Sequence, residues 1–251
     1  MVEQTNLTQR IELTEDVPMI YAAVFDMDGL LIDSEPLWKE AEKQVFSSVG
    51  VQVTEVLSKQ TATMTTGEVT RFWYERNPWQ EKSLEEVENA VVDKVETLII
   101  EKGCELEGVT ETLKLLKEKG FKIGLSTNSP YQLIPIILNK LGIASYFDAI
   151  SSSDDVEQGK PEPDVYLSTI NKLGVDSSNC IAFEDSYSGM LAATRANIKT
   201  VVIPQPDKFY QEFNEASLKL QKLSEFNESH LASLMDLSLR ATIAPTPHES
   251  F

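Results

Sequence analysis

Two aspartates, Asp26 and Asp28, close an apolar stretch near the start of the chain, in the segment YAAVFDMDGLLIDSEPLW. The residues before them suit a short buried strand, and a glycine follows directly. Two carboxylates at the end of a buried strand are costly to desolvate unless a positive group meets them. The segment therefore predicts a cation beside these acids, either a metal ion or a basic side chain.

Further polar residues follow other apolar, strand-like segments. They are Thr127 and Asn128 in LSTNSP, Lys160 in GKPEPD, and Glu184 and Asp185 in FEDSYSG. The carboxyl ends of parallel strands meet at one edge of a sheet, where functional groups collect. We therefore expect these residues and the two aspartates to share one site.

Four acids, one lysine and one hydroxyl at a single edge suit phosphoryl transfer. Clustered carboxylates repel one another, and Mg²⁺ relieves this repulsion with oxygen ligands while still meeting a phosphate. Lys160 can hold an acid and a phosphoryl oxygen together. One carboxylate can then attack phosphorus, and the acid two residues on can protonate the leaving oxygen and later activate water.

Each of these residues also has an ordinary structural interpretation. The aspartate pair could form an Asp-Gly turn, the lysine could lie on the surface, and Thr127 could simply end a strand. Glu184 and Asp185 could cap a helix that begins near Ser186, because helix N-termini favour negative charge. The occurrence of all four motifs in one chain favours the catalytic interpretation.

The elements that must position these residues alternate between strand and helix. Short apolar segments predict buried strands at Tyr21–Asp26, Phe121–Thr127, Phe147–Ser151, Cys180–Glu184 and Lys199–Ile203. Amphipathic segments that end in glycine, such as GVTETLKLLKEKG, predict helices between the later strands. This alternation predicts an α/β fold with a doubly wound, Rossmann-like parallel sheet.

The interval between the first two strands is far too long for one crossover helix. Its patterns, such as PLWKEAEKQVFSSVG and SLEEVENAVVDKVETLIIEKG, are helical, which predicts an inserted helical cap. Toward the end of the chain we expect a strand near Leu218–Leu220 and a helix near Glu228–Leu237. The predicted parts are a catalytic core at 18–34 and 104–237, a cap at 35–103, and flexible tails at 1–17 and 238–251.

Composition and charge limit the partners. An apolar content of 41% and a charged content of 25% are those of an ordinary globular protein. The net charge of −18 repels nucleic acid and anionic membranes. No segment resembles a signal peptide or a membrane span, so we expect a cytoplasmic protein. We expect a small phosphorylated metabolite as partner, neither nucleic acid nor membrane, and a monomeric chain.

The motifs FDMDG, STNS, GKPEPDVY and FEDSYSGM, in this order, resemble those of the haloacid dehalogenase-like hydrolases. The segments DMDGLLIDSEPLW and FWYERNPW are similar to those of its sugar-phosphate phosphatases, of the 2-deoxyglucose-6-phosphate and hexitol-phosphate type. The resemblance implies a Mg²⁺-dependent phosphomonoester hydrolase that acts on small sugar or polyol phosphates through an aspartyl phosphate.

The resemblance also implies a role for each site residue. Asp26 would be the nucleophile, and Asp28 the general acid and base, whose backbone carbonyl would also bind Mg²⁺. Thr127 and Asn128 would hydrogen-bond the transferring phosphoryl group, and Lys160 would orient and neutralise it. The catalytic residues would thus be Asp26, Asp28 and Lys160, the phosphate-binding residues Thr127, Asn128 and Lys160, and the metal-site residues Asp26, Asp28, Glu184 and Asp185.

The cap carries aromatic residues and few cations. We expect core packing for these aromatics, with a sugar-stacking surface as the alternative; they are Trp38, Trp73, Tyr74 and Trp79. In the segment TATMTTGEVTR, threonines and a methionine stand where similar proteins carry a cation in the cap loop, and Arg71 and Arg76 are the nearest cations. Substrate identity therefore stays open.

Two other functions compete with hydrolysis. One is a phosphosugar mutase of the β-phosphoglucomutase type, which uses the same aspartyl phosphate. Similar mutases place a histidine after the first motif, and the segment LLIDSEPLWKEAEKQ has none, which favours hydrolysis. The other is a catalytically inactive binding protein of the same fold. The retained acids and lysine count against it, because unpaired buried charges are costly to keep.

Overall fold

Six parallel strands form one sheet in the part of the chain that this computed structural model describes, residues 21–61, 64–205 and 213–234. The strands lie in the order β3-β2-β1-β4-β5-β6. Their bounds are β1 Ala22–Phe25, β2 Lys122–Thr127, β3 Ala149–Ser152, β4 Cys180–Glu184, β5 Lys199–Val202 and β6 Leu218–Lys219. Because β1 lies in the interior of the sheet, between β2 and β4, the residue that follows it enters the middle of the sheet's carboxyl edge.

The sequence predicted these strands to within one or two residues at either end. β4 matches its prediction, whereas β3 begins two residues late because the 3₁₀ helix η1 (Ala144–Tyr146) ends just before Phe147. Residues 228–234 are helical, and the rest of the predicted C-terminal helix lies outside the described residues. The tails predicted at 1–17 and 238–251 also lie outside them.

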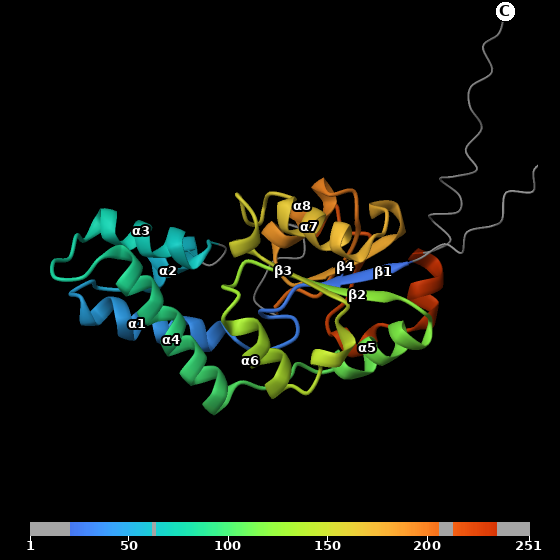
Figure 1. Ribbon diagram of the computed structural model, residues 1–251, viewed down its shortest axis with the longest axis horizontal. Helices are drawn as coiled ribbons and strands as arrows, with labels where there is room; N and C mark the ends of the chain where they lie inside the picture. Colours follow the sequence, from blue (N-terminus) through green and yellow to red (C-terminus); the bar gives the residue numbers. More distant parts are fainter. Residues whose placement is uncertain (1–20, 62–63, 206–212, 235–251) are drawn as a thin grey trace, which may run out of the picture.

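Helices cover both faces of the sheet (Figure 1). They include α5 (Val109–Glu118), α6 (Leu133–Lys140), α7 (Asp164–Leu173) and α8 (Tyr187–Arg195). Alternate residues of β1 belong to two separate hydrophobic clusters: Ala23 and Phe25 to the one that holds the buried leucines of α5 and α6, and Ala22 and Val24 to the one that holds Tyr166 of α7. A strand buried on both faces is typical of a doubly wound sheet, and the structure confirms that fold class.

Four helices between β1 and α5 lie together at one end of the sheet, on the left in Figure 1. They are α1 (Glu35–Ser48), α2 (Glu55–Thr61), α3 (Thr66–Arg76) and α4 (Leu84–Lys102). Capping boxes begin the last two, with Thr65 and Glu68 at α3 and Ser83 and Glu86 at α4. We propose that residues 35–103 form the cap and refer to these four helices by that name.

The two connections between cap and core run side by side. The backbone N–H of Asp33 donates to the Cys104 carbonyl at 3.1 Å, and that of Leu106 donates to the Leu31 carbonyl at 3.1 Å. Ile32 and Glu105 form an isolated antiparallel bridge between them. The two chain segments that connect the cap to the core therefore lie next to each other.

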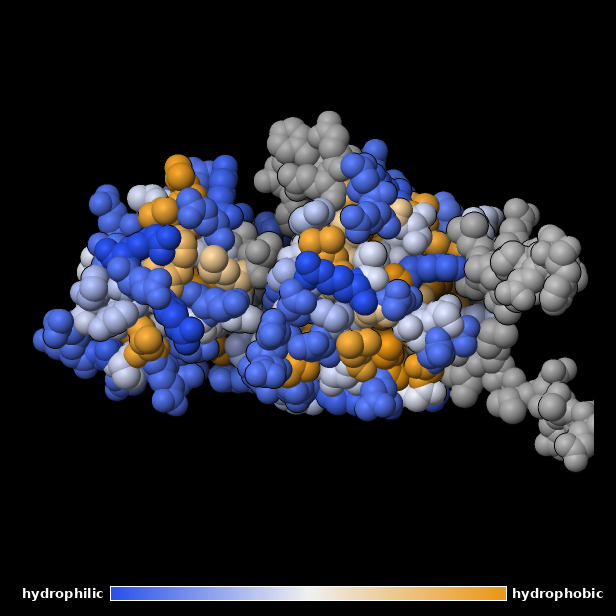
Figure 2. Space-filling model, turned by 90° about the horizontal axis from the view of Figure 1, so that it is seen from above, coloured by the Kyte–Doolittle hydropathy of each residue, from blue (hydrophilic) through white to orange (hydrophobic). Residues whose placement is uncertain are grey.

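The surface seen in Figure 2 is largely hydrophilic, with apolar residues scattered over it. Among the described helices, none combines the length and the apolar character that a membrane crossing requires.

Candidate active site

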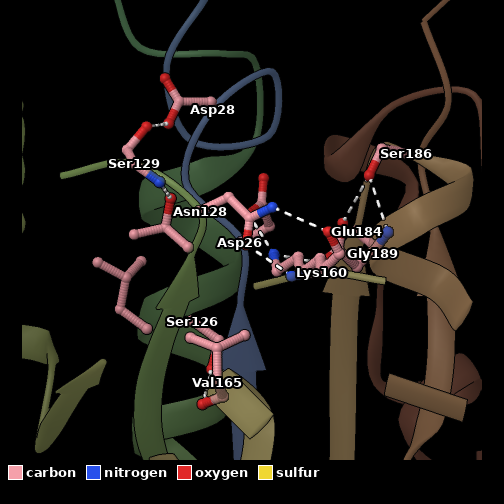
Figure 3. A network of polar contacts seen from close by, with 12 residues as sticks. Asp26, Asp28, Ser126, Asn128, Ser129, Lys160, Val165, Glu184, Ser186 and Gly189 are labelled. Carbon is pink, nitrogen blue, oxygen red and sulfur yellow. Dashed lines mark hydrogen bonds and ion pairs between the residues drawn. The ribbon is translucent and has the colours of Figure 1, made fainter. Parts of the chain in front are cut away.

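Two of the sequence-predicted acids, Asp26 and Glu184, meet Lys160 at the carboxyl edge of the sheet (Figure 3). Asp26 directly follows β1, Glu184 is the last residue of β4, and Lys160 comes from the loop that precedes α7. The Lys160 ammonium lies 2.5 Å from Asp26 Oδ1 and 2.6 Å from Glu184 Oε1. Lys160 is therefore a positive partner of the acid that ends the first strand.

This charged cluster is almost fully removed from water. The Lys160 side chain is only 4% exposed, and that of Glu184 is 0% exposed. The Tyr166 hydroxyl donates to Glu184 Oε1 at 2.6 Å, and the Ser186 hydroxyl lies 3.4 Å from Oε2. Glu184 thus receives hydrogen bonds from a lysine and a tyrosine, which fixes the end of β4 against the loop of Lys160.

Burial controls the charges of the cluster. It raises the pKa of Asp26 well above its ordinary value, against the lowering effect of Lys160, and Glu184 and Asp185 raise it further. Burial alone would lower the pKa of Lys160, but the adjacent Asp26 and Glu184 raise it instead. Lys160 therefore stays protonated, and its ammonium is the single positive charge described among three buried acids, Asp26, Glu184 and Asp185.

Three of these acids could hold a metal ion. Asp26, Glu184 and Asp185 each offer a carboxylate oxygen, and the three atoms lie within 4.8 Å of one another. An all-oxygen, buried and net negative site suits a hard divalent cation. Gly29 permits this close approach, because its φ is +75° and a Cβ there would lie 2.5 Å from Asp185 Oδ2.

The side chain of Asp28 lies apart from this cluster and is turned toward Ser129 (Figure 3). Its Oδ1 accepts hydrogen bonds from the Ser34 hydroxyl at 2.6 Å and from Trp38 Nε1 at 2.9 Å. Its Oδ2 accepts one from the Ser129 hydroxyl at 2.6 Å. Three donors therefore hold the Asp28 carboxylate, and one of them, Trp38, comes from the cap.

The two polar residues after β2 have partners of their own. Thr127 Oγ1 accepts a hydrogen bond from the Ser129 N–H at 3.0 Å. The Asn128 side chain accepts from the Lys160 N–H at 2.8 Å and donates to the Lys160 carbonyl at 3.1 Å. Asn128 thus holds the backbone of the loop that supplies Lys160, which the sequence did not predict.

A pocket of about 340 Å³ lies between the core and the cap. On the core side it is lined by Asp26, Asp28, Thr127, Asn128, Lys160 and Asp185, and on the cap side by residues that include Trp38, Glu42, Thr61 and Thr66. A second cavity, of about 440 Å³, shares the Lys160 loop but reaches neither Asp26 nor Asp28. The first pocket is therefore the one in which a substrate could meet both aspartates.

Comparison with known proteins assigns the family. Residues 23–203 match the family described as haloacid dehalogenase-like hydrolase. The chain belongs to this family. The match spans every strand of the sheet but β6 and includes the whole cap, so membership extends over both sides of the pocket.

Curated relatives within this family of hydrolases are named as phosphatases. Hexitol phosphatase B of Escherichia coli (strain K12) is 39% identical over 214 residues, which cover 84% of this chain and 96% of the relative. The phosphorylated carbohydrates phosphatase of Thermotoga maritima is 34% identical over 180 residues, 72% of this chain and 83% of the relative. These relatives bear out the predicted class of enzyme, a phosphatase.

A solved structure shows the same fold. The β-phosphoglucomutase of Clostridium difficile aligns with a TM-score of 0.78 at 23% identity and covers 88% of this chain and 100% of its own. The fold of the chain, over nearly its whole length, is therefore one that a solved structure shares.

The cap aromatics divide between the two predicted environments. Trp73 and Trp79 are buried and pack around Phe46, and Tyr74 lies edge-on against Trp79, which confirms core packing for these three. Trp38 instead lines the pocket and donates to Asp28. Its signal in the sequence was its place in the motif DSEPLW, just after the first strand.

The two arginines of α3, Arg71 and Arg76, lie away from the pocket, as the sequence suggested. Arg71 and Arg76 are exposed and do not line the pocket. The Arg76 guanidinium lies over the Phe72 ring at 3.5 Å from its centroid and donates to the Phe72 carbonyl. Among the described residues the pocket's basic groups are Lys160 from the core and Lys39 from α1.

Proposed function

We propose that the protein is a Mg²⁺-dependent phosphomonoester hydrolase that acts on small sugar or polyol phosphates through an aspartyl phosphate. The observation that carries this proposal is the buried cluster of Asp26, Lys160 and Glu184 at the base of a pocket roofed by the cap. The relatives named for hexitols and for phosphorylated carbohydrates support the substrate class.

In the first step an Asp26 carboxylate oxygen attacks phosphorus. The P–O bond to the substrate's carbon skeleton breaks, and the leaving oxygen takes a proton from Asp28. Lys160, already 2.5 Å from Asp26, neutralises charge on the phosphoryl oxygens as they approach the nucleophile. Asp26, Glu184 and Asp185 would hold Mg²⁺, which when bound supplies further charge neutralisation at the phosphoryl group.

In the second step water replaces the aspartate. Asp28, now ionised, takes a proton from water, whose oxygen bonds to phosphorus while the bond to Asp26 breaks. Inorganic phosphate leaves and both aspartates are restored. The hydrogen bonds from Ser34, Trp38 and Ser129 keep the Asp28 side chain in the same position through both steps.

We infer hydrolysis in preference to the mutase reaction. A mutase must keep water from its aspartyl phosphate until the intermediate has turned round, whereas a hydrolase uses water as its second substrate. No histidine lines the pocket among the described residues, and Trp38 is the cap group that contacts Asp28. Supplying β-glucose 1-phosphate with a trace of the 1,6-bisphosphate tests this, because a mutase would form glucose 6-phosphate much faster than inorganic phosphate.

The direct experiment measures phosphate release from a hexitol 6-phosphate with Mg²⁺, with EDTA and with Ca²⁺. We expect turnover with Mg²⁺, none with EDTA, and inhibition by Ca²⁺, because Ca²⁺ takes more ligands at longer distances and displaces the nucleophile. An equal rate in EDTA would contradict the metal site, and an absence of phosphate release under every condition would contradict the proposed reaction.

A further inference from the structure

One acid in the substrate pocket has no hydrogen-bond partner among the described residues and no place in the proposed reaction. Glu42, on α1, lines the pocket that contains Asp26 and Lys160. Its side chain is half-buried, and no residue in the described ranges gives it a hydrogen bond or ion pair. A half-buried carboxylate without a donor is costly, so an acceptor of this kind in a binding pocket indicates a ligand that donates hydrogen bonds.

The position of Glu42 follows from its helix. Residues four apart lie one above the other on a helix face, so Glu42 lies one turn, about 5 Å, from Trp38. Trp38 donates to Asp28, which marks the reacting end of the pocket. A substrate whose phosphoryl group lies at Asp26 would therefore present carbons several bonds from its ester oxygen to Glu42.

Apart from the Lys39–Glu35 ion pair, the rest of the cap wall is neutral and rich in hydroxyl groups. It includes Ser58, Thr61, Met64, Thr66 and Val69. The basic residue on this wall, Lys39, is 65% exposed and lies 3.5 Å from Glu35, which also lines the pocket. The buried Lys160 ammonium thus lies at the end of the pocket where the phosphoryl group would bind. Hydroxyl and carboxylate groups line the opposite end, on the cap.

We propose that Glu42 is the specificity-determining residue of this site. Its carboxylate accepts hydrogen bonds from the hydroxyls of an uncharged polyol or sugar chain, and its charge excludes phosphomonoesters that carry a second anionic group, such as phosphorylated carboxylic acids and sugar bisphosphates. This inference rests on the proposed function, because it assumes that a phosphoryl group is bound at Asp26.

The electrostatics of Glu42 agree with this role. Burial raises the pKa of Glu42 to about 7, and Lys39 opposes the shift only in part. A substrate hydroxyl would return the hydrogen bonds that burial removes, and bonds to an ionised acceptor are among the stronger ones. A second anion on the substrate would instead add like-charge repulsion in a partly desolvated pocket, most strongly above about pH 7, where Glu42 is ionised.

The test compares the full-length protein with its Glu42→Gln variant on three esters: a hexitol 6-phosphate, 2-phosphoglycolate and p-nitrophenyl phosphate. We expect kcat/KM for the hexitol phosphate to fall about 10- to 100-fold, as for the loss of one or two charge-assisted hydrogen bonds. kcat/KM for 2-phosphoglycolate should rise. kcat/KM for p-nitrophenyl phosphate should change little, because this ester has no chain of hydroxyl groups to donate to Glu42. Glu40→Gln, on the same helix outside this pocket and paired with Lys102, should leave all three unchanged.

The outcomes separate the two proposals. A selective loss on the hexitol phosphate together with a gain on 2-phosphoglycolate supports the role of Glu42. An active wild-type enzyme whose substrate ratios are the same in Glu42→Gln, or a uniform fall on all three esters, overturns that role and leaves the proposed hydrolase intact. A wild-type protein that releases phosphate from none of the esters overturns the hydrolase and the role of Glu42 together.

Discussion

The core wall and the cap wall of the pocket are built differently. On the core side, Asp26, Lys160 and Glu184 are buried and joined by short ionic hydrogen bonds. On the cap side, Glu42 has no hydrogen bond in the described part of the chain, and the other lining groups are mainly hydroxyls and apolar side chains. The core thus has its charges fixed before a substrate arrives, whereas the cap leaves hydrogen-bonding capacity for the substrate to fill.

This difference indicates a division of work. Groups that stabilise the charge of a reacting phosphoryl group act best when they are already in place, because no reorganisation is then needed. Groups that select among substrates act differently: they need only bind the non-reacting part of one substrate better than that of another. Changes in the core should therefore act on every ester alike, and changes in the cap should act on some esters more than on others.

The largest effect should come from Asp26→Asn. We expect turnover to fall by at least about 10⁴-fold on every phosphomonoester, because a neutral amide is a poor nucleophile. The fold should be kept, since the amide oxygen can still accept from Lys160. The measurement is phosphate release from two unrelated esters, with circular dichroism to check folding.

Asp33→Asn is the matched control, because Asp33 is exposed and lies seven residues further along the same connection. It should retain wild-type turnover. Residual activity of Asp26→Asn above about one per cent, or a loss confined to one ester, would remove Asp26 from the role of nucleophile.

A smaller loss should follow from Asp28→Asn. We expect a fall of about 10²- to 10⁴-fold, the usual contribution of a general acid and base. The loss should be less for p-nitrophenyl phosphate than for a hexitol phosphate, because a good leaving group needs less protonation. Equal losses on the two esters would argue that Asp28 supports the site by structure and not by proton transfer.

The fold and the core side of the site were accessible to sequence reasoning. Five apolar segments predicted the strands β1 to β5. Asp26, Lys160 and Glu184 each lie at or after the end of one of these strands, where a parallel sheet collects functional groups. Gly29 was visible in the sequence, but its positive φ and its closeness to Asp185 were not.

The cap side was not accessible in the same way. Trp38 and Trp79 have the same residue type and similar surroundings in the sequence, yet one donates to Asp28 and the other is buried in the cap. Which helix face meets the core depends on how two separate units dock, and periodicity within one helix does not contain that information. Glu42 was overlooked for this reason. The donors Ser34 and Ser129, which lie on the core side, were also not predicted, because nothing in the sequence marks either serine as a neighbour of Asp28.

Trp38→Phe tests the contact at which the two walls meet. It removes the hydrogen bond from Nε1 to Asp28 Oδ1 while keeping an aromatic ring in the pocket. Hydrogen bonds to charged groups contribute roughly 1.5–3 kcal/mol, and two donors to Asp28 remain, so we expect kcat to fall about tenfold. The measurement is steady-state kinetics on a hexitol phosphate and on p-nitrophenyl phosphate.

Trp79→Phe is the control for that variant. The Trp79 indole nitrogen is buried and finds no hydrogen-bond partner among the described residues, and its ring lies in the cap core. We expect this variant to lower thermal stability and to keep kcat. If Trp38→Phe keeps kcat as well, the hydrogen bond does not position Asp28.

The last expected effect is on stability and not on rate, in Glu42→Gln, and its sign follows from the burial of the Glu42 carboxyl. The pKa of Glu42 rises from an ordinary 4.5 to about 7 in the folded protein, so the folded state binds the proton more tightly than the unfolded state. Below pH 4.5 both states are protonated and Glu42 carries no penalty. Between pH 4.5 and 7 the unfolded state releases its proton first, and the free energy of unfolding falls as the pH rises.

Above pH 7 the full penalty is present, roughly 3 kcal/mol for a shift from 4.5 to about 7. Glutamine has no proton to release, so Glu42→Gln should be more stable than the wild type by about this amount at pH 8 and by little at pH 4.5. Urea unfolding of both proteins at a series of pH values measures the difference, and the other acids cancel because both proteins carry them.

A variant that is more stable at pH 8 and yet loses its preference for the hexitol phosphate would show that the cap keeps an unpaired charge for selection. A difference in stability that does not change with pH would mean that the Glu42 carboxyl is not desolvated, and the contrast between the two walls would then lose its electrostatic basis.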